Sequence, residues 1–281
     1  MNALDIINFG TKELKQRKIH SCRLDSELLL SKILKKNREE VLINLNQQIC
    51  KKSFSEFKKF INRRSKNEPL AYILEEKEFW SKNFYVNQDT LIPRPETELL
   101  VEKLVKIFKT KKISVLDIGT GSGCIIISLL SELKNSKGLG IDISKKALII
   151  AKKNSKKHIK HNRIKFLNKS LDCKFNQKFD LVVSNPPYIR SREIKNLKED
   201  IKKYEPLIAL DGGNDGLDLI KKVIYKTKYI LKVKGMLALE IGNEQFNKVS
   251  EILIKKNFKI EHIIKDYKDN VRCIISKKIE I

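Results

Sequence analysis

From residue 112 onward, short apolar segments alternate with segments of helical length, and this alternation constrains the fold most. Buried strands are predicted at 114–118, 139–143, 163–167 and 179–184, and a fifth at 235–241 follows a helix. Two late strand candidates, 258–264 and 271–275, flank the turn at 267–270. Strands that alternate with helices predict a doubly wound α/β sheet, which here ends in an antiparallel pair.

The segment before this sheet has a different pattern. Residues 1–66 carry apolar side chains at helical spacing and no strand-like alternation, so we expect a small helical domain. Residues 67–93 are aromatic-rich and contain a turn signal, which predicts a hairpin linker. Pro95 is well suited to the first turn of a helix, so the main domain is expected to span 94–281.

Composition leaves the nature of the partner open. The 281 residues include 59 Lys and Arg against 34 Asp and Glu, so the net charge is 59 − 34 = +25. Such a charge fits either a polyanionic partner or a solvated surface, and the lysines are scattered along the chain without forming a block. Ile and Asn are abundant as well, a combination that an A/T-rich coding bias would produce.

Cysteine and histidine spacing argues against metal or disulfide sites. The five cysteines are odd in number and far apart, which excludes a disulfide framework and favours reduced thiols in a cytoplasmic protein. His158 and His161 lie three apart in a lysine-rich stretch, which is more typical of an exposed helix end than of a ligand pair. We therefore expect no metal. The first residues lack a secretory leader pattern, and no apolar run reaches the roughly 18 residues of a membrane span.

A glycine-rich segment after the first strand predicts a cofactor site. The expected cofactor-binding residues are Gly119, Thr120, Gly121, Ser122 and Gly123. Their spacing differs from that of dinucleotide-binding loops, and the Lys-Ser/Thr of a P-loop is missing. The second strand contains Asp142, whose carboxylate can accept hydrogen bonds from both hydroxyls of a ribose. Together these features predict an S-adenosylmethionine site, whereas a purely structural turn is the weaker alternative.

The second motif follows the fourth strand and consists of Asn185, Pro186, Pro187 and Tyr188. Because ligands of open α/β sheets bind beyond the carboxyl ends of the strands, this motif and the glycine loop are expected to face one crevice. The prolines lack N–H donors, so the Asn185 side-chain carbonyl and the Pro186 backbone carbonyl remain as acceptors. They match the two N–H donors of a planar amino group, against which the Tyr188 ring can stack.

These motifs resemble the N-methyltransferases that carry an Asn/Asp-Pro-Pro-Tyr sequence and use S-adenosylmethionine. The resemblance narrows to the HemK/PrmC family through further segments: 67–100 with its Leu-Ile-Pro-Arg-Pro-Glu-Thr-Glu run, Tyr204-Glu-Pro, 212–218 and Leu239-Glu-Ile-Gly. That family comprises protein-(glutamine-N5) methyltransferases with a helical N-terminal domain and a Rossmann-like class I methyltransferase sheet. Two segments depart from the family pattern: Glu75 stands where glycine is usual, and 169–175 aligns poorly, which leaves Ser170 to Asp172 as candidates beside the adenine.

The resemblance implies the function and the roles of the motif residues. The expected reaction is an in-line methyl transfer from S-adenosylmethionine to the glutamine of the Gly-Gly-Gln loop of class-1 peptide chain release factors, which modulates translation termination. Asn185, Pro186 and Tyr188 would be catalytic; the same residues and Pro187 would bind the substrate; Ser170 and Asn185 would also contact the cofactor. Residues 1–66 would grip the protein substrate, and nucleic acid would not be required.

One alternative uses the same motif: an adenine-N6 methyltransferase that acts on a flipped base of DNA or RNA. The N-terminal segment shows no basic stripe with interleaved aromatics, and we expect no second recognition domain. A noncatalytic cofactor-binding or RNA-associated factor is a further alternative, but binding alone does not need paired acceptors.

Overall fold

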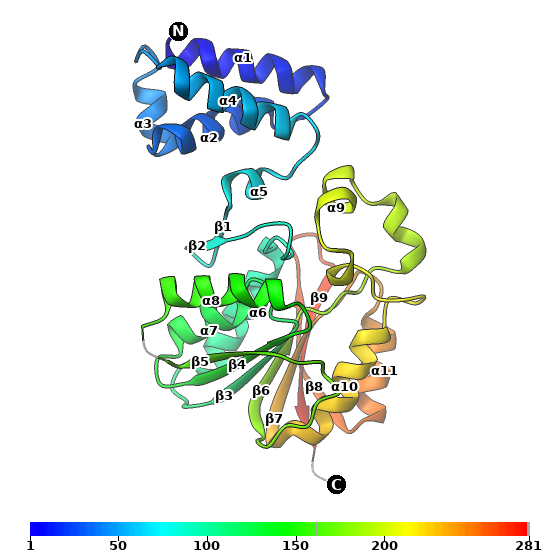
Figure 1. Ribbon diagram of the computed structural model, residues 1–281. Helices are drawn as coiled ribbons and strands as arrows, with labels where there is room; N and C mark the ends of the chain where they lie inside the picture. The colour runs from blue at the N-terminus through cyan, green and yellow to red at the C-terminus, as the bar shows by residue number, and fades with distance from the viewer. Residues whose placement is uncertain (161, 280–281) are drawn as a thin grey trace. The chain divides into compact units, whose positions relative to one another are not determined.

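A computed structural model describes residues 1–160 and 162–279 of the chain. The chain divides into two compact units (Figure 1). The first comprises Met1–Glu76 and Lys198–Tyr204, and the second comprises Lys77–Leu197 and Glu205–Ile281. Neither unit contains, among the described residues, a helix long and apolar enough to cross a bilayer.

The first unit is helical. It contains α1 (Ala3–Gln16), α2 (Cys22–Leu34), α3 (Arg38–Ile43), α4 (Lys51–Arg64), α5 (Leu70–Leu74) and α9 (Glu199–Tyr204). Capping boxes begin α1 at Asn2 and α3 at Asn37, because each Asn accepts from a backbone N–H while an acid three residues on accepts in return. Apolar side chains of α1, α2 and α4 form its core.

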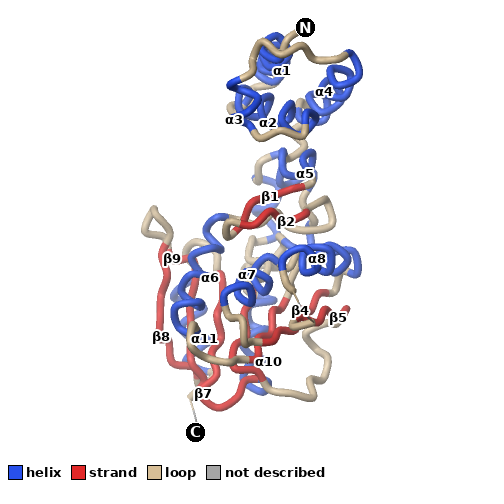
Figure 2. The backbone as a smooth tube through the Cα atoms, turned by 90° about the vertical axis from the view of Figure 1, so that its left-hand side faces the viewer, coloured by secondary structure: helices blue, strands red, loops and turns tan. Residues whose placement is uncertain are grey.

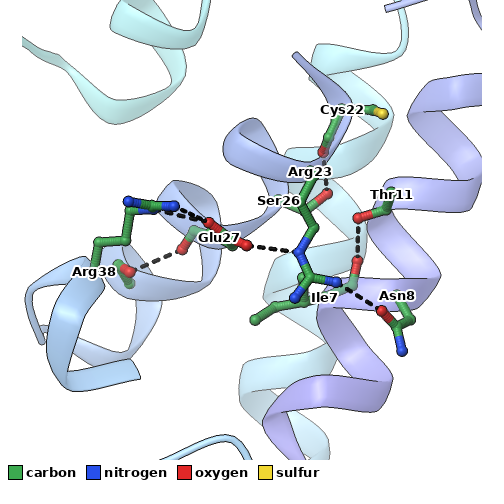
Figure 3. A network of polar contacts seen from close by, with 9 residues as sticks. Ile7, Asn8, Thr11, Cys22, Arg23, Ser26, Glu27 and Arg38 are labelled. Atoms are coloured by element: carbon green, nitrogen blue, oxygen red, sulfur yellow. Dashed lines mark hydrogen bonds and ion pairs between the residues drawn. The ribbon is translucent and has the colours of Figure 1, made fainter. Parts of the chain in front are cut away.

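A buried carboxylate connects two segments of this unit. Glu27 on α2 accepts hydrogen bonds from Arg23 at 2.6 Å and from Arg38 at 2.8 Å, and Figure 3 shows it between the two guanidinium groups. Burial alone raises the pKa of Glu27, but the hydrogen bonds and charges of both arginines lower it below its ordinary value. The ion pairs thus keep a buried acid charged and tie α3 to α2.

The second unit is built on a seven-stranded sheet. Its strands are β3 (Ser114–Ile118), β4 (Lys137–Asp142), β5 (Ile164–Asn168), β6 (Phe179–Ser184), β7 (Leu231–Glu240), β8 (Phe258–Lys265) and β9 (Val271–Lys278). The order is β5-β4-β3-β6-β7-β9-β8, in which only the pairs of β9 are antiparallel. The predicted fold class, a mostly parallel Rossmann-like sheet with an antiparallel pair at its end and helices before it, is confirmed.

Helices cover both faces of this sheet, as Figures 1 and 2 show. One face carries α6 (Pro95–Phe108), α7 (Cys124–Glu132) and α8 (Lys145–His158), and the other carries α10 (Asp218–Ile230) and α11 (Phe246–Lys255). Neighbouring residues of a strand point to opposite faces, so Val115 joins the core under α6 and α7 while Leu116 joins the core under α10 and α11. The central strands β3 and β6 are therefore buried on both faces, whereas the edge strands β5 and β8 are partly exposed.

The segment expected to be a hairpin linker has two parts. Residues 70–74 form α5, and the hairpin itself consists of β1 (Glu76–Phe79) and β2 (Lys82–Tyr85). Phe79 and Phe84 of the hairpin are buried in the core of the second unit. Because the hairpin packs there, the first unit ends at Glu76, ten residues after residue 66, where the predicted helical domain ended.

A loop region that the sequence pattern left unassigned follows β6. It contains two short 3₁₀ helices, Ser191–Asn196 and Leu207–Ala209, on either side of α9. Ile189 and Asp211 form an isolated parallel bridge, which closes this excursion beside the end of β6. The excursion thereby returns to the carboxyl edge of the sheet, where the two sequence motifs lie.

Candidate active site

The glycine loop joins β3 to α7 and lies at the carboxyl end of the sheet. Gly119 and Gly121 have φ values of 70° and 55°, a region in which a Cβ is strained. The backbone N–H groups of Gly119 and Thr120 both donate to the Ile141 carbonyl at 3.0 Å. The loop is therefore tied to β4, with Gly119 facing open space in which a Cβ would meet no atom within 4 Å.

The other loop residues support this conformation. The Thr120 hydroxyl donates to Asp117 at 2.6 Å, and burial raises the pKa of this acid to about 7. The Ser122 carbonyl accepts from the side-chain amide of Asn154, which also bonds both backbone groups of Tyr85 in the hairpin. Asn154 on α8 therefore connects the loop to the hairpin, and Gly123 begins α7.

Asp142 ends β4 beside the loop. One of its carboxylate oxygens accepts from the backbone N–H of Gly121 at 2.9 Å, and the other accepts from that of Ser144 at 2.9 Å. Desolvation is the largest influence on its pKa and raises it, against the effect of these hydrogen bonds. The carboxylate is thus held in one orientation, with further lone pairs available to a ligand.

A cavity of about 390 Å³ opens at this edge of the sheet. It is lined by these predicted site residues: Gly119, Gly121, Asp142, Ser170, Asn185, Pro186 and Pro187. Thr120, Ser122, Gly123 and Tyr188 are not among the lining residues. Thr120, Ser122 and Gly123 instead stabilise the loop through the contacts described above.

The segment after β6 forms another wall of the cavity. The Ser184 hydroxyl donates to the Ile118 carbonyl at 2.8 Å, which ties the end of β6 to the end of β3. Asn185 and Pro186 then line the cavity. The Tyr188 backbone carbonyl accepts from the Gln245 side chain at 3.0 Å, and its half-buried ring packs against the core under α10 and α11. Burial raises the pKa of Tyr188, so its hydroxyl stays neutral.

The geometry fits S-adenosylmethionine. The cavity has the size and concavity of a cofactor site. Its lining includes glycine backbone and a strand-end carboxylate, the groups expected for a nucleoside ligand, together with the acceptors of Asn185 and Pro186. The two sequence motifs are about 65 residues apart in the sequence. They follow the parallel neighbours β3 and β6, so both border one cavity at the carboxyl ends of these strands.

Several lining residues were not singled out from the sequence. They are Gln88, Asp89, Thr90, Leu91, Ile118, Ile141, Ile143, Ser144, Ala147, Lys169, Pro206, Ile208, Ala209, Leu219 and Lys222. Asp172 had been a candidate together with Ser170, and the Ser170 hydroxyl donates to its carboxylate at 3.1 Å. The Asn87-Gln-Asp turn and the Pro206 segment were visible signals for loops, but a loop does not reveal which cavity it borders.

Of the two histidines assigned from the sequence to an exposed helix end, only one lies among the described residues. His158 ends α8, and its Nε2 lies 2.9 Å from the Asn83 carbonyl. His161 lies outside the described residues. Across residues 1–160 and 162–279, no group of three or more His, Cys, Asp or Glu side chains is arranged to hold a metal ion.

Comparisons with known proteins agree with this architecture. Residues 5–74 match the PrmC N-terminal domain, and residues 95–203 match the methyltransferase small domain. The chain is 40% identical to the release factor glutamine methyltransferase of Buchnera aphidicola subsp. Acyrthosiphon pisum, over 92% of each protein. It is 38% identical to that of Fusobacterium nucleatum, over 98% of this chain and 78% of that one. The chain spans 56% of the Rickettsia typhi bifunctional methyltransferase, at 38% identity.

Solved structures share the fold at low sequence identity. A methyltransferase from Pyrococcus furiosus has a TM-score of 0.54 at 18% identity, over 77% of this chain and 98% of that one. The ribosomal protein L11 methylase of Lactobacillus delbrueckii subsp. bulgaricus has a TM-score of 0.50 at 21% identity, over 66% and 81%. The chain has the sheet and the strand-end motifs described above, and it is 38–40% identical to these relatives over more than nine-tenths of its length. It therefore belongs to the family of release factor glutamine methyltransferases.

Proposed function

We propose that this protein transfers a methyl group from S-adenosylmethionine to the side-chain amide nitrogen (N5) of the glutamine in the Gly-Gly-Gln motif of class-1 peptide chain release factors, and so modulates translation termination. The observation that carries the proposal is the single cavity that the glycine loop, Asp142 and the Asn185–Pro186 acceptors share. The names of the relatives supply the substrate.

The cofactor end of the cavity is assigned to the glycine loop and β4. Gly119 and Gly121 leave the backbone open to close approach, while Thr120, Ser122 and Gly123 hold the loop in shape. Asp142 accepts the ribose hydroxyls, and Ser170 with its partner Asp172 borders the same space. When bound, S-adenosylmethionine supplies an electrophilic methyl group on a sulfonium.

The substrate end is assigned to the segment after β6. The Asn185 side-chain oxygen and the Pro186 backbone carbonyl accept the two N–H bonds of the glutamine amide. These bonds favour a nitrogen with a more localised lone pair and hold it in a reactive orientation, a contribution that can reach several kcal/mol. Pro187 stiffens the segment, Tyr188 supports it through its carbonyl bond to Gln245, and no strong base is required before transfer.

We assign the gripping of the protein substrate to the helical residues 1–66. A single amide offers little binding energy, so contacts remote from the reacting atoms must position it. The first unit has its own core, and none of its described residues lines the cavity, so we assign it a role apart from the chemistry. We place the reaction in the cytoplasm, where release factors work and where five scattered thiols would stay reduced.

One experiment separates this proposal from its rival. The protein is incubated with methyl-labelled S-adenosylmethionine and either a class-1 release factor, a release factor whose Gly-Gly-Gln glutamine is changed to Ala, or DNA and RNA oligonucleotides. We expect label in the intact release factor alone. Label in adenine of an oligonucleotide, with the release factor unlabelled, would replace the proposal with the adenine-N6 alternative.

A further inference from the structure

A buried carboxylate stands behind Asn185, outside the cavity lining. Glu240 is the last residue of β7, the neighbour of β6 in the sheet, and only 2% of it is exposed. Its carboxylate accepts a hydrogen bond of 2.6 Å from the hydroxyl of Thr97, in the first turn of α6. Thr97 is equally buried, and its Oγ1 lies 3.4 Å from the side-chain nitrogen of Asn185.

Counting protons fixes the orientation of the Asn185 amide. A hydroxyl has one proton, and the short bond commits the Thr97 proton to Glu240, so only the lone pairs of Oγ1 remain for Asn185. Lone pairs attract the amino group of an amide and repel its carbonyl. The NH2 of Asn185 must therefore face Thr97, and its carbonyl oxygen is left for the cavity.

We propose that Glu240, acting through Thr97, is a positioning residue that locks the side chain of Asn185 with its carbonyl oxygen toward the substrate. The opposite amide rotamer would present two donors to the donors of the substrate and would not bind it. This inference rests on the proposed function, because it concerns the group that receives the glutamine amide. Burying the Glu240 carboxylate costs desolvation free energy, which an apolar side chain at a purely structural position would avoid.

The surroundings of Glu240 make the lock sensitive to protonation. Desolvation raises the pKa of Glu240 to about 7, while hydrogen bonds from Thr97 and Asn185 lower it. Glu96 on α6 raises the pKa further, and Arg272 on β9 lowers it.

Three further titratable groups interact with this carboxylate. They are Tyr188, Cys124 at the start of α7 and Cys273 on β9, and the Glu240 charge raises the pKa of each. Desolvation raises all three pKa values as well, so these groups stay neutral near pH 7. Glu240 therefore changes its charge near pH 7, whereas these three groups do not; Asp117, whose pKa is also about 7, lies at the glycine loop, where it bonds to Thr120.

The charge of Glu240 determines the direction in which kcat changes with pH. Above pH 7 the ionised carboxylate only accepts, which commits the Thr97 proton. As pH falls through about 7, the carboxyl gains a proton of its own, and the hydroxyl is released to donate to the Asn185 oxygen instead. We expect kcat, measured at saturating substrates, to decrease on this acidic side.

Two substitutions at Thr97 test the lock. Thr97→Val keeps the branched shape of the side chain but removes the hydroxyl, whereas Thr97→Ser keeps the hydroxyl. We expect Thr97→Val to lower kcat for the release factor by about ten- to a hundredfold, with the dissociation constant of S-adenosylmethionine unchanged, and Thr97→Ser to stay within about threefold of wild type. Thr227→Val removes another fully buried hydroxyl, on α10, and should leave kcat unchanged. Equal kcat values for the Val and Ser variants would overturn the inference.

Glu240→Gln provides a second readout. We expect a lower kcat above pH 7 and a smaller decrease of kcat on the acidic side than in wild type, because the amide at position 240 does not titrate while Asp117, whose pKa is also about 7, still does. An acidic decrease in Glu240→Gln as large as that of wild type, or a parallel loss of cofactor affinity, would refute the positioning role. An inactive wild-type protein would instead refute the proposed function, which keeps the two failures distinct.

Discussion

At the scale of single residues, the candidate site depends on carboxylates with different tasks. Asp142 borders the cavity and already accepts two backbone N–H bonds, whereas Asp117 lies behind it and bonds to Thr120. The first can contact a ligand directly, and the second acts through the loop that it supports.

We expect Asp142→Ala to weaken S-adenosylmethionine binding by about 1–3 kcal/mol, because charge-assisted hydrogen bonds to the ribose are lost. Calorimetric titration measures this directly. Asp215→Ala is the matched control, since Asp215 pairs with Lys221 outside the cavity lining and should leave the affinity unchanged. An unchanged affinity in Asp142→Ala would remove this residue from the cofactor site.

Asn185→Ala should separate cofactor binding from turnover. We expect kcat for the release factor to fall by about a hundredfold or more, because an interaction realised in the transition state is removed. The dissociation constant of the cofactor, measured by the same titration, should change much less. Comparable losses in both would make Asn185 a cofactor or structural residue.

At the scale of elements, the antiparallel end of the sheet depends on its turn. Asp266 follows β8 and accepts hydrogen bonds from the backbone N–H groups of Lys268 and Asn270, and from Arg272 at 2.8 Å. Desolvation by itself raises the pKa of Asp266, but these bonds outweigh it and lower the pKa to about 2. One carboxylate thus organises the connection between β8 and β9.

Asp266→Asn should therefore destabilise the protein at neutral pH. An acid whose folded pKa is depressed stabilises the fold above its ordinary value of 3.8, and this contribution is lost as pH falls toward about 2. Thermal unfolding at pH 7 and at low pH measures the effect, and the gap between wild type and variant should shrink on acidification. A gap that is independent of pH would mean that the charge of Asp266 is irrelevant to the turn.

At the scale of the whole molecule, the cavity belongs entirely to the second unit. A truncated form that begins at Lys77, the first residue of that unit, keeps Phe79 in its core. We expect this form to bind S-adenosylmethionine like the full chain.

Its kcat/KM toward an intact release factor should fall by at least about tenfold, because the remote contacts of the first unit are gone. A short Gly-Gly-Gln peptide, which makes no such contacts, should be a poor substrate of equal kcat/KM for both forms. Steady-state kinetics with the two substrates provides the comparison. Equal methylation of the intact protein by both forms would contradict the gripping role.

The sequence by itself determined the class of fold and the chemistry of the two motifs. The short apolar runs 114–118 and 179–184, the glycines after the first strand and the prolines after the fourth are local features, and each constrains its own backbone. The rule that parallel strands end at one edge then brings both motifs to a common crevice. The start of α6 at Pro95 and the turn at 267–270 follow from local chemistry in the same way.

Only the tertiary structure decided which groups meet. Thr97 and Glu240 are 143 residues apart, and in the sequence Thr97 is one polar residue of a helix start while Glu240 is an acid at the end of an apolar strand. Gln88–Leu91 and the residues Pro206, Ile208 and Ala209 likewise become cavity walls through packing. Side-chain periodicity reports which face of an element is buried, but the partner across that face depends on strand register and helix packing, which are properties of the whole fold.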